Sequence, residues 1–211
     1  MQWEIRDNTL YITGKGYIPD VNYEDCDKWN KGVFSKVVIG EGITSIGDYA
    51  FFSLEDLESV VLPDTLKGIW DSAFECCVSL VHINIPSSVT DIGHYAFERC
   101  YKLKNISIPD GVTYIGEGAF LFCRSLKSIT IPDGVTYIGN CAFEGCENLE
   151  NITIPDSVQE IGDSVFLGCK DIIISTSKDS QAHRYAVASN IKVKLIDEPK
   201  KETKRDKGYE R

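Results

Sequence analysis

The chain has 211 residues, of which 43% are hydrophobic and 26% charged, as in an ordinary folded domain. Its formal net charge is −10 and its isoelectric point about 4.8. This argues against nucleic acid or an anionic membrane as a partner, because both attract positive surfaces. No apolar run reaches the roughly 20 residues that cross a bilayer, so we expect no insertion into a membrane.

Residues 1–33 are predicted to form an N-terminal cap. Hydrophobic residues alternate on either side of a turn-forming pair, a pattern typical of a β-hairpin. These residues are Trp3, Ile5, Leu10 and Ile12 around Asp7-Asn8. The hairpin would cover the open edge of the structure that follows. The first residues contain no basic start followed by an apolar stretch, so we expect no signal peptide in the chain as given.

A pattern with a period of 23 residues runs through residues 34–171. Residues at the same position of successive repeats form a column. One column holds phenylalanine, and further columns hold isoleucine, alanine, proline and cysteine with the same spacing. The phenylalanine column is Phe51, Phe74, Phe97, Phe120, Phe143 and Phe166, and the cysteine column is Cys77, Cys100, Cys123, Cys146 and Cys169. Repetition at a fixed period of this length is typical of a solenoid.

Each repeat reads L-x-x-I-x-I-P-x-x-V-x-x-I-G-x-x-A-F-x-x-C-x-x. The alternating L-x-x-I-x-I segment predicts a short strand with one buried face. The proline ends this strand because it cannot donate a ladder hydrogen bond. Turn residues such as Asp110-Gly111 follow, and then a second extended stretch, V-x-x-I-G. We expect A-F-x-x-C to form about one helical turn, which would place Phe120 and Cys123 on one side.

A single repeat cannot bury its own apolar side, so successive repeats must stack. We expect parallel strands about 4.8 Å apart in neighbouring coils, and inward-facing columns of like residues. The cysteine column begins with Leu54, and a position that accepts leucine is apolar and buried. We interpret these thiols as inert core residues, with a disulfide or a metal site as the less favoured alternative.

The period shortens after Cys169, and residues 172–196 are predicted to form a C-terminal cap. We expect a strand at 172–174, a helix from Ser180 to Ser189 and a closing strand. The alternating hydrophobic residues of the closing strand are Ile191, Val193 and Leu195. Residues 197–211 are charged and nearly devoid of apolar side chains, which predicts a disordered tail.

No combination of residues indicates catalysis, so we expect a protein that is not an enzyme and needs no cofactor or metal. The cysteines include no C-x-x-C pair with histidines at zinc-ligand spacing. The histidines are His82, His94 and His183, and each is interpreted as an ordinary surface residue because none has an evident catalytic partner.

Outward-facing positions of the repeats are the candidate binding surface. On the first strand of each repeat they form two columns of mostly small polar side chains. These are His82, Asn105, Ser128 and Asn151 beside Asn84, Ser107, Thr130 and Thr153. Tyr114 and Tyr137 stack on the adjacent face, and aromatic residues are common interface anchors. A solvated sheet face and two ordinary surface tyrosines are the alternatives.

The repeat resembles the BspA-like (treponemal-type) leucine-rich repeat family from Phe34 to Cys169. Trp3–Gly16, with Ile18-Pro19-Asp20 behind it, is similar to the N-terminal cap of that family, and Ser180–Leu195 to its C-terminal cap. The resemblance implies an α/β solenoid, a right-handed leucine-rich-repeat-like coil of short parallel strands.

The resemblance also implies a non-catalytic binding module or scaffold that contacts another protein through the sheet face, in the manner of a surface adhesin. The expected partner is a host or cell-surface protein, with a glycan as the alternative, and we expect a monomer. The family implies a secreted or cell-surface location, whereas the missing signal peptide leaves the cytoplasm open. The alternative function is a structural spacer whose charged C-terminal tail carries the partner interaction.

Overall fold

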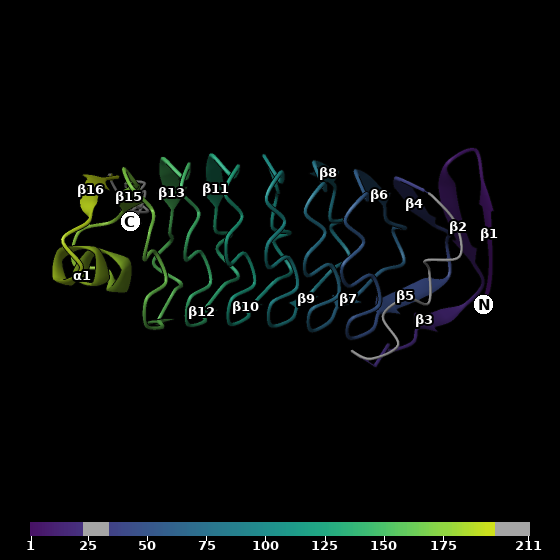
Figure 1. Cartoon of the computed structure of the whole chain (residues 1–211). Coiled ribbons are helices and arrows are strands. Elements are labelled where there is room, and N and C mark those ends of the chain that lie inside the picture. Colours follow the sequence, from purple (N-terminus) through teal and green to yellow (C-terminus); the bar gives the residue numbers. More distant parts are fainter. Residues whose placement is uncertain (23–33, 197–211) are drawn as a thin grey trace, which may run out of the picture.

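The computed structural model describes residues 1–22 and 34–196. The chain forms a solenoid of parallel strands with about eight turns spaced by about 23 residues, which confirms the fold predicted from the repeat. The N-terminal hairpin lies at one end of the coil and a short helix at the other (Figure 1). The predicted tail, 197–211, and residues 23–33 of the predicted N-terminal cap lie outside the described residues.

The N-terminal hairpin consists of β1 (Gln2–Arg6) and β2 (Thr9–Thr13), which are antiparallel. Its turn residues, Asp7 and Asn8, both have positive φ, as a tight hairpin turn of the primed type requires. Leu10 and Ile12 are fully buried, whereas Trp3 is 45% exposed. The difference arises because β2 pairs with the coil and β1 is the outer edge strand.

The first extended segment of the turns forms one row of parallel strands. The row consists of β4 (Lys36–Ile39), β6 (Ser59–Val61), β8 (His82–Ile83), β11 (Ser128–Thr130), β13 (Asn151–Thr153) and β15 (Ile173–Thr176). Residues 105–107, between β8 and β11, keep the alternation of buried and exposed side chains but are not a regular strand. The row is therefore divided into two sheets.

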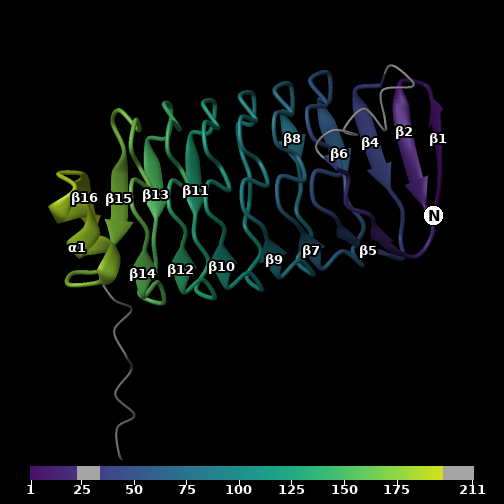
Figure 2. The same ribbon diagram turned by 60° about the horizontal axis from the view of Figure 1, so that its bottom comes forward.

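The second extended segment forms one continuous parallel sheet of seven strands, on another side of the coil (Figure 2). Its strands are β3 (Gly16–Ile18), β5 (Ile43–Ile46), β7 (Gly68–Ile69), β9 (Asp91–Ile92), β10 (Tyr114–Ile115), β12 (Tyr137–Ile138) and β14 (Glu160–Ile161). A hydrogen-bonded turn separates the two rows, as where Val112 N–H donates to the Pro109 carbonyl at 3.0 Å. β11 ends at Thr130 and β13 at Thr153, shortly before Pro132 and Pro155, as predicted.

The A-F-x-x-C segment is a pair of consecutive turns, which corrects the helical turn expected from the sequence. Positive φ recurs four residues apart, for example at Gly118 (57°) and Phe122 (59°). Alternate N–H groups then point to the next coil: those of Gly118, Phe120 and Phe122 donate to the carbonyls of Asn140, Ala142 and Glu144 at 2.7–2.9 Å. A helix would use these N–H groups internally, whereas the turns form a third ladder between coils.

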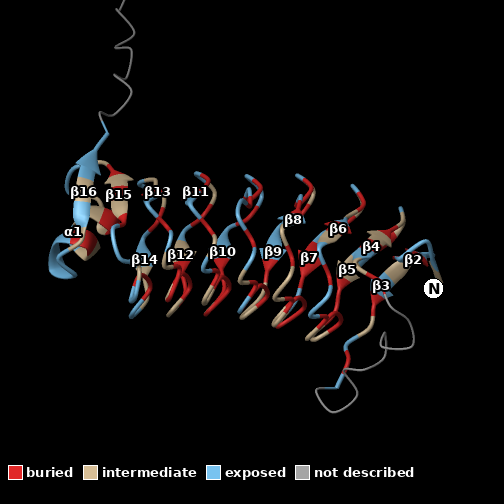
Figure 3. Ribbon diagram, turned by 45° about the horizontal axis from the view of Figure 1, so that its top comes forward, coloured by how far each residue is buried: buried red, intermediate tan, exposed pale blue. Residues whose placement is uncertain are grey.

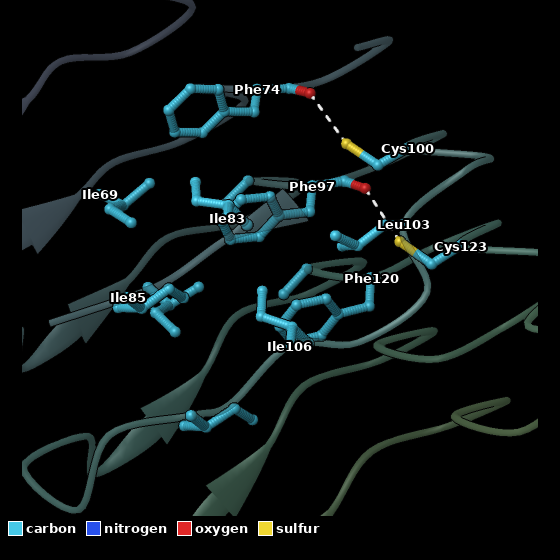
Figure 4. Packing of buried hydrophobic residues seen from close by; sticks show 14 of the residues in the cluster. Ile69, Phe74, Ile83, Ile85, Phe97, Cys100, Leu103, Ile106, Phe120 and Cys123 are labelled. Atoms are coloured by element: carbon cyan, nitrogen blue, oxygen red, sulfur yellow. Dashed lines mark hydrogen bonds between the residues drawn. The ribbon is translucent and has the colours of Figure 1, made fainter. Parts of the chain in front are cut away.

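Buried residues recur at equivalent places in each turn (Figure 3). The six phenylalanines of the column stack with ring centroids 5.2–5.8 Å apart. The cysteine column lies beside this stack (Figure 4) and is buried as expected, except for the half-buried Cys169 in the last turn. The core is therefore a continuous set of ladders of like residues.

The C-terminal segment consists of β15, α1 (Gln181–Ala188) and β16 (Lys192–Leu195), close to the predicted elements. The helix begins after Ser180, whose Oγ accepts a hydrogen bond from His183 N–H at 3.0 Å. Tyr185 packs edge-on against Phe166 and ends the phenylalanine stack. Leu195, part of the alternating pattern of the closing strand, is 53% exposed on β16, an edge strand that pairs with β15.

Candidate binding surfaces

The ten predicted binding residues lie on two different faces of the coil. The eight polar residues belong to the row of first strands, whereas Tyr114 and Tyr137 lie on β10 and β12 of the second sheet. The sequence therefore identified two separate surfaces rather than one site.

The polar columns are presented in register. Ser128 pairs with Asn151 and Thr130 with Thr153 across β11 and β13. Seven of the eight polar residues are exposed, and Thr153 is half-buried. This exposure agrees with the outward orientation predicted from the alternation.

The polar columns change character towards both ends of the coil. At the N-terminal end, Val61 occupies the column of Asn84 and is 46% exposed. At the C-terminal end, the register places Lys192 beside Ile173 and Lys194 beside Ser175. The column of Asn84 is thus apolar at Val61, whereas the column of His82 continues through Ser59 to the exposed Lys36, and lysines also flank the C-terminal end.

The two tyrosines form a tight stack on the second sheet. Their ring centroids lie 5.1 Å apart with an interplanar angle of 3°. His94 packs edge-on against Tyr114 at 5.9 Å. Burial raises the pKa of the Tyr114 phenol, and the nearby Tyr137 adds to this shift. The stack is therefore a fixed aromatic surface rather than two independent side chains.

A pocket of about 140 Å³ opens beside this stack. Its walls include Trp70, Asp71, Asp91, His94 and Tyr114. Trp70 is 43% exposed and Tyr114 is 37% exposed, which is high for large aromatic side chains. The pocket combines two aromatic surfaces with two carboxylates from neighbouring coils.

Trp70 and the two aspartates were not among the predicted site residues, although the sequence contains a signal for them. Five turns place glycine after the isoleucine of the second strand, as at Gly47 and Gly93, whereas Trp70 occupies that column. A large aromatic residue in a glycine column marks a local departure from the repeat.

His94 is not the freely solvated residue that the sequence suggested. Its backbone N–H donates to Asp71 Oδ1 at 2.7 Å, and its Nδ1 accepts a hydrogen bond from Glu117 N–H at 3.0 Å. Asp48 and Asn140 accept equivalent bonds from the following coil. His94 is therefore one member of a column of side-chain acceptors that ties successive turns together.

The cysteine column is structural. Each Sγ, as in Cys100 and Cys123, donates to the carbonyl of a phenylalanine in the preceding coil at 3.2–3.3 Å (Figure 4). Burial raises the pKa of the Cys123 thiol far above its ordinary value, so the thiolate does not form near neutral pH. The sequence predicted the burial and missed the hydrogen bond.

Two further hollows lie at the ends of the coil. One of about 510 Å³ is lined by Met1, Trp3 and Tyr11 on the outer hairpin, and one of about 420 Å³ lies between Leu167 and Tyr185 at the C-terminal end. Within residues 1–22 and 34–196, no group of three or more histidine, cysteine or acidic side chains is arranged to hold a metal ion. In the same residues, no helix is long and apolar enough to span a membrane.

The sequence matches a known repeat family. The family described as BspA type Leucine rich repeat region matches residues 27–133 and 115–205, with six copies of its repeat. No curated protein matches the chain.

Two solved structures are similar over most of the chain. A leucine rich cell surface protein from Faecalibacterium prausnitzii is 32% identical with a TM-score of 0.70, over 85% of this chain and 53% of that protein. This chain therefore spans about half of the Faecalibacterium protein. The Treponema pallidum leucine rich repeat protein is 26% identical with a TM-score of 0.67, over 92% of this chain and 94% of that protein.

Proposed function

Because the chain belongs to the BspA-type leucine-rich repeat family, we propose that it is a non-catalytic scaffold that binds another protein through the exposed columns of its first strands. The observation that carries this proposal is the exposure of Asn105, Ser128 and Asn151 at equivalent positions of successive turns, with Ser128 and Asn151 paired in register on β11 and β13. Backbone positions set by the coil in this way lose little additional freedom when a partner binds.

The location is part of the same proposal. The Faecalibacterium protein is a cell surface protein, and we carry that location over to this chain. A surface scaffold would meet host or neighbouring cell-surface proteins, or the glycans attached to them. Labelling of intact producing cells with a reagent that does not cross membranes should modify the protein, whereas labelling only after lysis would contradict a surface location.

The proposed binding face can be tested by a triple substitution. The protein is immobilised, its partners are captured and identified, and the affinity of a purified partner is measured. Replacing Asn105, Ser128 and Asn151 with arginine should weaken that affinity by at least about tenfold, because bulky charged side chains would obstruct the central column.

A matched control is available in another exposed column. Asp110, Asp133 and Asp156 share the 23-residue spacing and are exposed at the turn after the proline. Replacing them with arginine should change the affinity less than twofold. Equal losses in the two triple variants, or no loss in the first, would exclude the first-strand face.

The spacer alternative makes a different prediction. In this alternative the coil is only a structural spacer, and residues 197–211 bind the partner. The chain ending at residue 196 should keep its affinity if the coil is the binding surface. Loss of binding on truncation, with the triple variant unaffected, would favour the spacer.

A further inference from the structure

The pocket beside Trp70 arises from two linked departures from the repeat. Trp70 stands where the other turns have glycine, and Gly68 stands where they have a residue with a side chain. The indole atoms Cε2 and Cζ2 lie 3.2 Å from the position that a Cβ on Gly68 would take. The indole is thus folded back over Gly68 and occupies the space that a side chain at that position would fill.

The indole and Tyr114 stand on opposite sides of one strand. Gly68, Asp91 and Tyr114 are equivalent positions on β7, β9 and β10, which pair in that order. Two strand spacings separate the outer positions by about 9.6 Å. A planar group that enters the space between them can stack on an aromatic ring.

Asp71 and Asp91 are among the residues that line the pocket, and Asp91 lies on β9, between β7 and β10. Asp91 Oδ2 accepts a hydrogen bond from the Thr90 hydroxyl at 2.7 Å, and Asp71 Oδ1 accepts one from His94 N–H at 2.7 Å. These bonds orient the carboxylates and engage one oxygen of each. No lysine or arginine is among the residues that line the pocket, and the whole chain carries a net charge of −10.

We infer that this pocket binds an arginine side chain of the partner protein. The inference rests on the proposed function, because it requires a polypeptide partner. A guanidinium is planar, stacks on aromatic rings and donates several hydrogen bonds to carboxylates, which matches Trp70, Tyr114, Asp71 and Asp91. The volume of about 140 Å³ accommodates a single side chain rather than a folded surface.

A short peptide tests the pocket without the natural partner. Acetyl-Gly-Gly-Arg-Gly-Gly-amide is titrated into the ¹⁵N-labelled full chain, and the three tryptophan indole resonances are followed by NMR. The Trp70 resonance is assigned by its loss in Trp70→Gly, which restores the glycine of the other turns and should fold normally. We expect the arginine peptide to shift this resonance saturably, and the same peptide with citrulline to cause little change, because citrulline has a similar shape and no charge.

Two double variants distinguish peptide binding in the pocket from general electrostatic attraction to the negatively charged protein. Asp71→Asn combined with Asp91→Asn should lower the affinity for the arginine peptide by at least about tenfold, because charged hydrogen bonds are lost. Asp110→Asn combined with Asp133→Asn removes the same amount of negative charge outside the pocket and should lower the affinity for the peptide less than twofold. Equal effects of the two pairs, equal shifts by arginine and citrulline, or no saturable shift of Trp70 would overturn the inference.

Failure of the arginine pocket can be distinguished from failure of the proposed scaffold function. If the partner binds and the first-strand variant weakens it while the peptide does not bind, only the arginine pocket is excluded. If the peptide binds and no protein partner is captured, the pocket stands as an arginine site and the scaffold function fails. A saturable shift with methyl β-glucoside in place of the arginine peptide would assign the pocket to a sugar and overturn the inference.

Discussion

The thiol of Cys123 donates a hydrogen bond to the backbone carbonyl of Phe97 at 3.2 Å, 26 residues earlier in the chain. The same carbonyl accepts a second bond from the backbone N–H of Cys100, in its own coil. Cys123 thus fills a fully buried site and links its own coil to the preceding one.

Replacing Cys123 with alanine should lower the free energy of unfolding by about 1–2 kcal/mol, because a buried sulfur atom and its weak hydrogen bond are lost. Urea denaturation followed by circular dichroism measures this change. Cys141→Ala is the matched control, since Cys141 lies outside the column and is only half-buried, and it should cost less than about 0.5 kcal/mol. Equal costs would argue against a specific role for the column.

The burial of Cys123 also predicts its reactivity. Because its thiol is held in the neutral form, iodoacetamide at pH 8 should leave Cys123 unmodified in the native protein and modify it after denaturation. Mass spectrometry of the digested protein reports each site separately. Modification of native Cys123 at the rate seen in urea would contradict its placement in the core.

Removing one ring from the phenylalanine stack should be costly. Phe120 is fully buried and stacks on both Phe97 and Phe143. Phe120→Ala should therefore destabilise the protein by about 3–5 kcal/mol, as a large core truncation does. Phe122→Ala, two residues away and half-buried, should cost less than half as much. A thermal melt of Phe120→Ala that overlays the parent would contradict the stack.

Glycines in the turn ladder are not equivalent. Gly145 and Gly168 both have positive φ, yet a Cβ on Gly145 would clash with the Phe122 ring, whereas one on Gly168 would meet nothing closer than 3.4 Å. Both alanine variants carry the backbone cost of about 1 kcal/mol. Gly145→Ala should cost about 2 kcal/mol more, because the ring must move. Equal denaturation midpoints for the two variants would contradict the packing described.

The Tyr95 hydroxyl donates to Glu117 in the next coil. This bond, with burial, raises the pKa of Tyr95 from 10.0 to about 12. A raised tyrosine pKa favours the folded state while the phenol is neutral. Its contribution is therefore complete below about pH 10 and is lost as the pH rises to about 12.

Denaturation midpoints between pH 8 and pH 12 test this prediction. The parent should lose more stability over pH 10–12 than Tyr95→Phe, which lacks the titrating group. The pKa values of Tyr114 and Tyr185 are raised as well, so absorbance at 295 nm should show one fewer late-titrating tyrosine in Tyr95→Phe than in the parent. Parallel pH profiles for the two proteins would exclude the contribution.

The fold could be predicted from the sequence because the same residue types recur every 23 residues. Columns such as that of Phe120, kept in phase every 23 residues, can be buried only if equal turns stack on one another. The hairpin at Asp7-Asn8 and the helix after Ser180 have strong local signals in turn and capping residues. The exposure of Ser128 and Asn151 follows from strand alternation, while their role in binding stays a prediction.

The turns and the pocket were decided by tertiary structure. Non-glycine residues such as Cys141 adopt positive φ because the N–H groups then pair with the next coil, a gain that no local propensity contains. Trp70 and Tyr114 are 44 residues apart in the sequence and line the same pocket only because the strand period places them two coils apart. A repeat specifies which residues point inward, whereas contacts between different outward residues depend on how neighbouring turns are aligned in space.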